Sequence, residues 1–285
     1  MYKIPCSNHD INTADIKAVV QSLKSSYITT GPKVIEFEKK LLKNFGSKYA
    51  VSLNSATSAL HLVCLALGLK KNDYLWTSPI SFVASSNCGL YCDAKIQFVD
   101  IDKNNFNLCP EAFEAKLAAT DKKKLPKIVV VVHLAGNPVD MKKIKTLSRK
   151  YKFKTIEDAS HAAGSVFDSS KIGSCKYSDA CIFSFHPVKT FTTGEGGAVL
   201  TNSKSMFEKI TSLRSHGMHR NKKETFLKKN YDIKQIGFNY RMSDIHAALG
   251  ISQLKRINQF VKARNQIANY YKNNILSSKI KFQKI

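Results

Sequence analysis

The sequence contains little acid and little arginine for its size. Its 285 residues carry 45 Lys and Arg against 21 Asp and Glu, a formal net charge of +24. Six of the basic residues are arginines, so 39 are lysines. Proteins that read nucleic acids rely on arginine for bidentate contacts. We therefore interpret the charge as a lysine-rich, solvated surface and expect no nucleic-acid partner.

Long apolar runs and paired cysteines are also lacking. No segment approaches the roughly 18–20 apolar residues of a membrane span, and the opening MYKIPCSNHD has no apolar signal core. The seven cysteines show no Cys-x-x-Cys pair of the kind that zinc sites use. These absences predict a reduced, cytoplasmic protein with no membrane partner and no metal.

The sequence has neither a G-x-G-x-x-G fingerprint nor a Walker A loop, so dinucleotide and nucleoside-triphosphate binding are not supported. It does have a hydrophobic content of 43%, which is enough for a large core. Short β-rich runs alternate with helical periodicity, which predicts an α/β protein with a mainly parallel sheet sandwiched by helices. Strands are expected at residues 49–53, 74–77, 95–99, 128–132, 154–157, 180–185 and 198–201. From residue 242 the pattern predicts nearly continuous helix, followed by a strand over residues 279–285.

Three segments carry reactive groups where the predicted strands end, the edge at which parallel sheets bind ligands. Residues 54–60 are rich in small and hydroxyl side chains and open a helix, which suits a phosphate; plain helix capping is the alternative. Asp158 follows a strand and can hold a cationic ring nitrogen, unless it is a cap or a surface carboxylate. Lys189 lies in an apolar, aromatic and glycine-rich stretch, where desolvation favours the neutral amine, although among 39 lysines position alone does not single it out.

Together these segments supply the groups that pyridoxal 5′-phosphate (PLP) requires. They offer a phosphate cradle, an acid for the pyridine nitrogen and an amine for a Schiff base. The acid keeps the ring nitrogen protonated, so that the ring can accept electrons from a carbanion. The sequence therefore predicts a PLP enzyme.

Seven motifs along the chain resemble the DegT/DnrJ/EryC1/StrS family of sugar-nucleotide aminotransferases. They are YITTGP from Tyr27, NSATSALHL from Asn54, TSPISFVASSN from Thr77, EDASHAAGS from Glu157, SFHPVKTFTTGEGGAV from Ser184, RSHGM from Arg214 and GFNYRMSDIHAALG from Gly237. The resemblance implies PLP-dependent transferase fold type I, which is like aspartate aminotransferase. It also implies a large PLP-binding domain over residues 1–250 and the start of a small C-terminal domain over residues 251–285. Relatives continue well beyond this point, so we expect the small domain to be incomplete.

The resemblance also implies a reaction. The motifs most resemble members that transfer an amino group from L-glutamate to the C4 keto group of a UDP-4-keto-6-deoxy-N-acetyl sugar, a step toward pseudaminic acid. Another keto-sugar aminotransferase of the family is one alternative, and a truncated remnant that binds PLP without turnover is another. A dehydratase is disfavoured, because such members typically replace the lysine with histidine.

The family's residue roles carry over to matching positions. Lys189 would form the Schiff base and move the proton, Asp158 would pair with the pyridine nitrogen, and His161 would lie beside the ring. Phe82 would stack on the ring, although a core position is the simpler interpretation of any phenylalanine. The other cofactor residues would be Ala56, Thr57, Ser184 and Asn239. The sugar nucleotide would be bound by Cys6, Ser26, Tyr27, Ile28, Thr29, Ala56, Ser184 and Asn239.

Two of these assignments bear on the quaternary structure and the substrate. Asn239 would reach the phosphate in the neighbouring subunit, so the resemblance implies a homodimer whose active sites are shared. Cys6 stands where close relatives carry a tyrosine near the substrate, a departure that weakens the assignment of the particular sugar.

Overall fold

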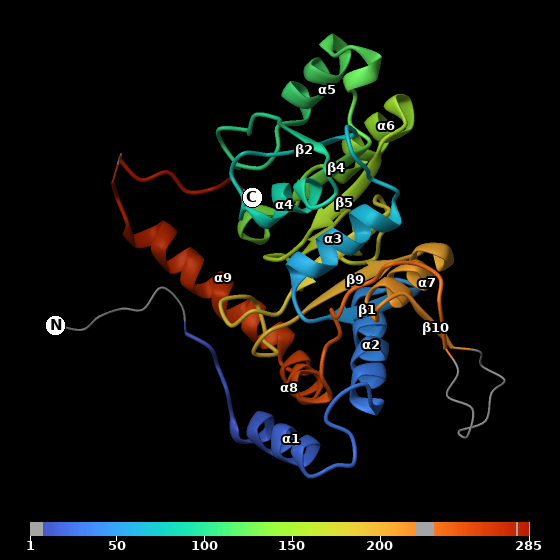
Figure 1. Cartoon of the computed structure of the whole chain (residues 1–285). Helices are drawn as coiled ribbons and strands as arrows, with labels where there is room; N and C mark the ends of the chain where they lie inside the picture. The colour runs from blue at the N-terminus through green and yellow to red at the C-terminus, as the bar shows by residue number, and fades with distance from the viewer. Residues whose placement is uncertain (1–7, 221–230, 278, 285) are drawn as a thin grey trace.

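The computed structural model describes residues 8–220, 231–277 and 279–284. It centres on a seven-stranded sheet with the strand order β1-β9-β8-β5-β4-β2-β3 (Figure 1). Pairing is parallel from β8 to β3 and antiparallel on both sides of β9, which confirms the predicted mainly parallel sheet. The strands are β1 (Tyr49–Leu53), β2 (Tyr74–Thr77), β3 (Lys95–Phe98), β4 (Ile128–Val132), β5 (Lys154–Asp158), β8 (Ala180–Ser184) and β9 (Gly197–Thr201).

Helices cover both faces of this sheet. The α-helices of the described residues are α1 (Thr13–Leu23), α2 (Pro32–Phe45), α3 (Ala56–Ala66), α4 (Ala84–Leu90), α5 (Pro110–Ala119), α6 (Met141–Tyr151), α7 (Lys204–Leu213), α8 (Asp244–Leu254) and α9 (Ile257–Asn274). Along β4, Ile128 and Val130 pack with α3, α4 and α7, whereas Val129 and Val131 pack with α5 and α6. Successive strand side chains point to opposite faces, so this run of apolar residues requires cover on both.

Helix α2 shows how the local sequence attaches a helix to the sheet. Its buried residues Val34, Phe37, Leu41 and Phe45 recur every three or four positions and pack in one core cluster with β8, β9 and α8. Gly46 ends the helix in the left-handed conformation, with φ at 84°.

Two short antiparallel pairs complete the strands: β6 (Val166–Phe167) with β7 (Ser170–Lys171), and β10 (Met218–Arg220) with β11 (Tyr231–Ile233).

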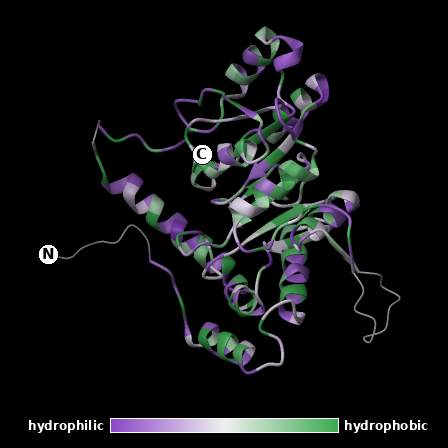
Figure 2. Cartoon of the chain, in the orientation of Figure 1, coloured by the Kyte–Doolittle hydropathy of each residue, from purple (hydrophilic) through white to green (hydrophobic). Residues whose placement is uncertain are grey.

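The helices near the two ends of the chain extend away from the sheet. Helix α1 packs against α8, and most of α9 is exposed (Figure 1). Figure 2 shows hydrophobic residues concentrated in the central strands, while α9 carries many hydrophilic ones. Within the described ranges, no helix is long and apolar enough to cross a membrane. The predicted domain boundary at residue 250 falls inside α8, and the division remains a prediction.

The strand predicted at the end of the chain is wrong. Residues 279–284 form no strand and instead lie against two loops. The Lys284 N–H donates to the Asn104 carbonyl at 2.9 Å, and the Lys284 carbonyl accepts from Asn137 Nδ2 at 2.8 Å. A strand requires a neighbouring strand with a regular series of backbone donors and acceptors, whereas these loops form only single hydrogen bonds with the segment. The helix predicted from residue 242 is likewise divided into α8 and α9.

Candidate active site

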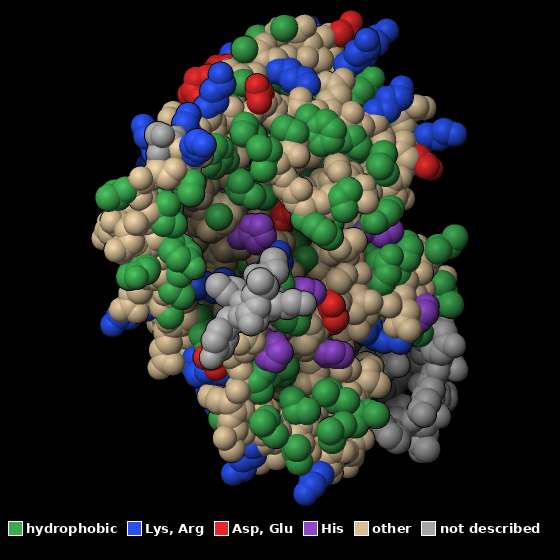
Figure 3. Space-filling model, turned by 90° about the vertical axis from the view of Figure 1, so that its left-hand side faces the viewer, with side chains coloured by type: hydrophobic (Ala, Val, Ile, Leu, Met, Phe, Trp, Pro, Cys, Tyr) green, Lys and Arg blue, Asp and Glu red, His purple; other side chains and the backbone are tan. Residues whose placement is uncertain are grey.

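The carboxyl ends of β1, β5 and β8 meet the start of β9 at one edge of the sheet. Asp158 ends β5 and pairs with Ile182 of β8, while Ser184 of β8 pairs with Gly197 at the start of β9. A cavity of about 370 Å³ opens at this edge. Figure 3 shows the hollowed face, with histidine side chains gathered around the hollow. The cavity is lined by Ser55, Ala56, Thr57, Leu60, Ser81, Phe82, Ala84, Val132, Asp158, Ser160, His161, Ser184, His186, Val188, Lys189, Glu195 and Gly196.

Asp158 is a buried carboxylate held by hydroxyl and backbone donors. Its Oδ2 accepts a hydrogen bond from Ser85 Oγ at 2.6 Å. Its Oδ1 accepts from Ser160 Oγ at 2.6 Å and from the Ser160 N–H at 3.2 Å. Within the described part of the chain, no basic side chain lies within 4.0 Å of this carboxylate. Because a buried charge is costly unless it is paired, this environment favours a cationic group in the cavity.

The connection between β8 and β9 is folded so that a lysine reaches the cavity. Its ends are joined by a hydrogen bond from the Phe185 N–H to the Gly196 carbonyl at 2.9 Å, and the Thr193 N–H donates to the Phe185 carbonyl at 3.0 Å. Phe191 is buried against Phe185, with ring centroids 4.8 Å apart. The aromatic residues thus anchor the connection in the core and leave Lys189 on its cavity side.

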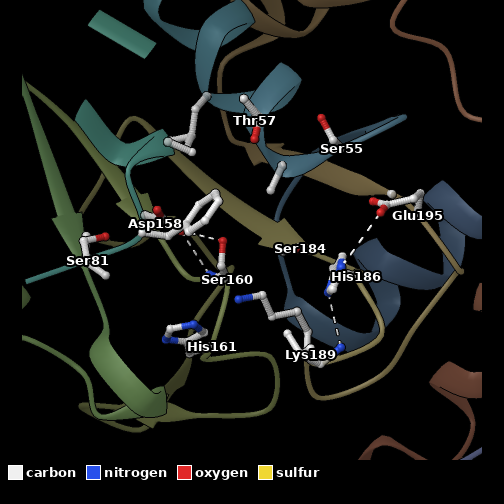
Figure 4. A pocket seen from close by; sticks show the side chains of 17 residues that line it. Ser55, Thr57, Ser81, Asp158, Ser160, His161, Ser184, His186, Lys189 and Glu195 are labelled. Atoms are coloured by element: carbon white, nitrogen blue, oxygen red, sulfur yellow. Dashed lines mark hydrogen bonds and ion pairs between the residues drawn. The ribbon is translucent and has the colours of Figure 1, made fainter. Parts of the chain in front are cut away.

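Lys189 extends across the cavity between Ser160 and His161 (Figure 4). Burial lowers the pKa of the Lys189 amine below its usual value, and the negative charge of Asp158 opposes that shift without cancelling it. The neutral, nucleophilic form of the amine is therefore easier to reach than in a surface lysine.

The start of α3 forms the opposite wall. Ser55 caps the helix, because its Oγ accepts the N–H at the third helical position at 3.0 Å. The N–H groups of Ala56 and Thr57 belong to the first turn, which leaves them without partners inside the helix. A Cβ on Gly197 would come within 2.4 Å of Ala56 N, so glycine lets β9 approach this closely. With the Ser184 hydroxyl nearby, the helix start is suited to an anion such as phosphate.

His161 is oriented by the backbone of a neighbouring loop. The Ala135 N–H donates to His161 Nδ1 at 3.3 Å, which assigns the ring proton of the neutral imidazole to Nε2. Burial lowers the pKa of this histidine, and the positive charge of Lys189 lowers it further. His161 is therefore a neutral donor at the cavity wall.

Seven residues with predicted cofactor roles lie on the wall of this one cavity: Ala56, Thr57, Phe82, Asp158, His161, Ser184 and Lys189. Phe82 is 69% exposed, so the core interpretation of this residue is wrong. Its stacking role, like the other individual roles, stays a prediction.

The other predicted residues that the structure describes do not line the cavity of their own chain. Asn239 is exposed and pairs with Ser215 in an isolated bridge. Residues 26–29 are exposed in the loop before α2, where the Ile28 carbonyl accepts the Asp244 N–H at 3.0 Å. Cys6 lies outside the described residues.

The two serines that hold Asp158 were not among the residues predicted from the sequence. Ser160 follows it by two positions, a spacing at which short polar side chains commonly bond to each other and to the backbone, so this signal was available. Ser85 comes from α4, 73 positions away, and no local pattern connects it with Asp158.

A doubly covered, mainly parallel sheet with a lysine, a buried aspartate and a helix start around one cavity defines an α/β enzyme of the aminotransferase class. Comparison with known proteins places it more narrowly. Residues 9–284 match the model of the DegT/DnrJ/EryC1/StrS aminotransferase family, and the chain belongs to that family.

Several relatives resemble nearly the whole chain. The UDP-4-amino-4,6-dideoxy-N-acetyl-beta-L-altrosamine transaminase of Campylobacter jejuni serotype O:2 is 43% identical over 93% of this chain and 68% of its own length. The spore coat polysaccharide biosynthesis protein SpsC of Bacillus subtilis is 36% identical over 94% and 68%.

Solved structures of aminotransferases also superpose on nearly the whole chain. Helicobacter pylori PseC, described as an aminotransferase involved in the biosynthesis of pseudoaminic acid, superposes with a TM-score of 0.86 at 33% identity, covering 95% of this chain and 70% of that one. The PMP-form of the putative sugar aminotransferase Spr1654 from Streptococcus pneumoniae gives 0.89 at 30% identity, covering 97% and 73%.

Proposed function

We propose that this protein transfers an amino group from L-glutamate to the C4 keto group of a UDP-4-keto-6-deoxy-N-acetyl sugar, using PLP. The Campylobacter relative is named for a UDP-linked 4-amino sugar, which supports this sugar class. In the balanced reaction the donor's amino group and a hydrogen replace the keto oxygen of the sugar, and the donor leaves as the corresponding 2-oxo acid. Within the family, transfer to another keto sugar is the alternative.

The residues present fit PLP. The observation that carries the proposal is Asp158, a buried carboxylate without a basic partner among the described residues, in the same cavity as a half-buried lysine. A protonated pyridine nitrogen would supply the missing positive charge. The start of α3 and Ser184 would hold the phosphate, and His161 and Phe82 would bind the ring. When bound, PLP supplies an electron-accepting ring that stabilises a carbanion on the donor carbon.

The chain's own residues then perform the proton transfers. Asp158, whose carboxylate oxygens accept hydrogen bonds from Ser85 and Ser160, would accept the hydrogen bond of a protonated ring nitrogen. Lys189 Nζ, whose pKa is lowered by burial, removes the proton from the donor α-carbon and delivers one to C4 of the sugar. His161 donates from Nε2 into the cavity and helps to orient the ring.

The proposal includes a homodimer with shared active sites. Asn239 and residues 26–29 are exposed and lie outside the cavity of their own chain, which is the arrangement expected of residues that serve a partner's site. A protein of this composition would act in the cytoplasm.

The test is nitrogen transfer by the full chain. PLP-loaded protein is incubated with isotope-labelled L-glutamate and a panel of 4-keto UDP-sugars, and mass spectrometry follows the label into the sugar. We expect labelled 4-amino sugar from the wild type and none from Lys189→Ala. A wild type that binds PLP and labels no sugar would support the remnant alternative, and one that binds no PLP would refute the whole proposal.

A further inference from the structure

A second cavity, of about 420 Å³, shares Val188 and Lys189 with the first. Its walls come from the segment before α1, the connection that carries Lys189, and the helices α8 and α9. On α9 the lining residues are Phe260, Ala263, Arg264 and Ile267, which form one face of the helix at the usual three- and four-residue spacing. The reactive lysine thus stands between the PLP cavity and this chamber.

Arg264 is the feature of the chamber that the proposed mechanism does not use. Its Nη2 donates to the Lys189 carbonyl at 2.7 Å, which holds the guanidinium beside the lysine backbone. Among the described residues, no carboxylate lies within 4.0 Å of this guanidinium. The carboxylate of Asp10, which lines the same second cavity, is already paired with Arg256 at 2.8 Å. Arg264 therefore has donors and a charge to offer to an anion.

A second observation locates the charge of Arg264 near the PLP cavity. His161 lines that cavity, and its pKa is lowered chiefly by burial but also by the positive charges of Lys189 and Arg264. The guanidinium charge therefore acts on the wall of the PLP cavity as well as on the Lys189 backbone.

We propose that Arg264 binds the distal carboxylate of the amino donor and thereby selects a dicarboxylic amino acid; this inference rests on the proposed function. An extended lysine side chain places Nζ about 6 Å from its Cα, and the amine of glutamate lies about 5 Å from its distal carboxylate. A donor whose amine meets Nζ can therefore lie along the lysine and bring its distal carboxylate to the guanidinium. Arginine suits this task because its planar fork of donors matches a carboxylate.

The test compares donors that differ at the distal group. PLP-loaded wild type, Arg264→Gln and Lys262→Gln are mixed with L-glutamate, L-glutamine or L-alanine, and the visible spectrum of the cofactor reports the half-reaction rate. Lys262 is the matched control, since it is an exposed cation on the same helix with no hydrogen bond or ion pair among the described contacts. Calorimetry with glutarate and butyrate measures binding without any reaction.

We expect Arg264→Gln to slow the reaction with glutamate and to weaken glutarate binding by about tenfold to a hundredfold, the range for a charge-assisted hydrogen bond. Glutamine, alanine and butyrate should be unaffected, and Lys262→Gln should behave like wild type. Equal losses with every donor would reduce Arg264 to a positioning residue for Lys189 and overturn the proposal, as would no loss at all. If the wild type reacts with no amino acid, the proposed function fails, whereas the glutarate comparison still decides whether Arg264 binds a dicarboxylate.

Discussion

At the scale of single residues, the site depends on the relation between two opposite charges. Lys189 loses basicity because it is half-buried, and it regains part of it from Asp158. Asp158 is fixed by Ser85 and Ser160, which are neutral donors and leave its charge uncompensated. This arrangement is suited to PLP chemistry. The lysine has a lowered pKa, and the nearby carboxylate has no basic partner of its own among the described residues.

Replacing Asp158 with asparagine should change the pH dependence of cofactor attachment. The reactive amine is neutral, so the attachment rate of the wild type should rise with pH and level off above the pKa of Lys189, which burial lowers below the usual value of a lysine. Asp158→Asn removes the charge that raises this pKa, so the rise should move to lower pH. It should also weaken PLP binding about tenfold to a hundredfold, because the pyridine nitrogen loses its ionic partner.

The measurement is the rate at which the visible absorption of bound PLP develops across a pH series. Asp179→Asn is a matched control, since Asp179 pairs with Lys154 at 3.0 Å and is not among the residues that line the cavity. An unchanged profile in Asp158→Asn, or a shift to higher pH, would contradict the assigned coupling.

At the scale of elements, the site depends on how closely a strand approaches a helix start. Gly197 opens β9 and lies against the backbone that leads into α3, where a Cβ would come within 2.5 Å of the Ser55 carbonyl carbon. Because the obstacle is backbone, it cannot rotate away as a side chain could. The glycine therefore fixes the start of α3, to which the proposed function assigns the phosphate, relative to Ser184, its partner in the ladder.

Gly197→Ala should disturb both stability and cofactor binding. Forcing the strand and the helix start apart should cost about 1–3 kcal/mol of unfolding free energy, as overpacking usually does, and should weaken PLP binding. Gly68→Ala is the comparison, because Gly68 has φ at 77° and open space around it. It should cost about 1–2 kcal/mol through backbone strain while leaving PLP affinity unchanged. Urea unfolding and PLP titration separate the two effects; equal PLP affinities in the two variants would refute this role of Gly197.

The elements themselves were largely predictable. The strand at Ile128–Val132 appears with its predicted bounds, because a short run of five β-branched residues bounded by turn residues favours a buried strand over a helix. The prediction of a terminal strand was wrong because β-propensity alone does not show whether a neighbouring strand is present to pair with. In the structure this segment lies against loops.

At the scale of the whole molecule, the order of motifs along the chain made the cavity predictable, since successive parallel strands deliver their carboxyl ends to one edge. Asp158 and Lys189 were found in this way. Ser85 and Arg264 could not be, because each acts through a contact made across a long stretch of sequence. Residues 26–29 and Asn239 lie outside the cavity of their own chain, and the role proposed for them in a partner's site requires a second copy of the chain.

The lysine that binds the cofactor can be located on the chain by trapping the Schiff base. The purified protein is incubated with PLP, reduced with borohydride and digested, and the modified lysine is identified by mass spectrometry. We expect one modified site, Lys189, among the 39 lysines, and no modification in Lys189→Ala. Modification scattered over surface lysines, or the same yield in Lys189→Ala, would contradict it.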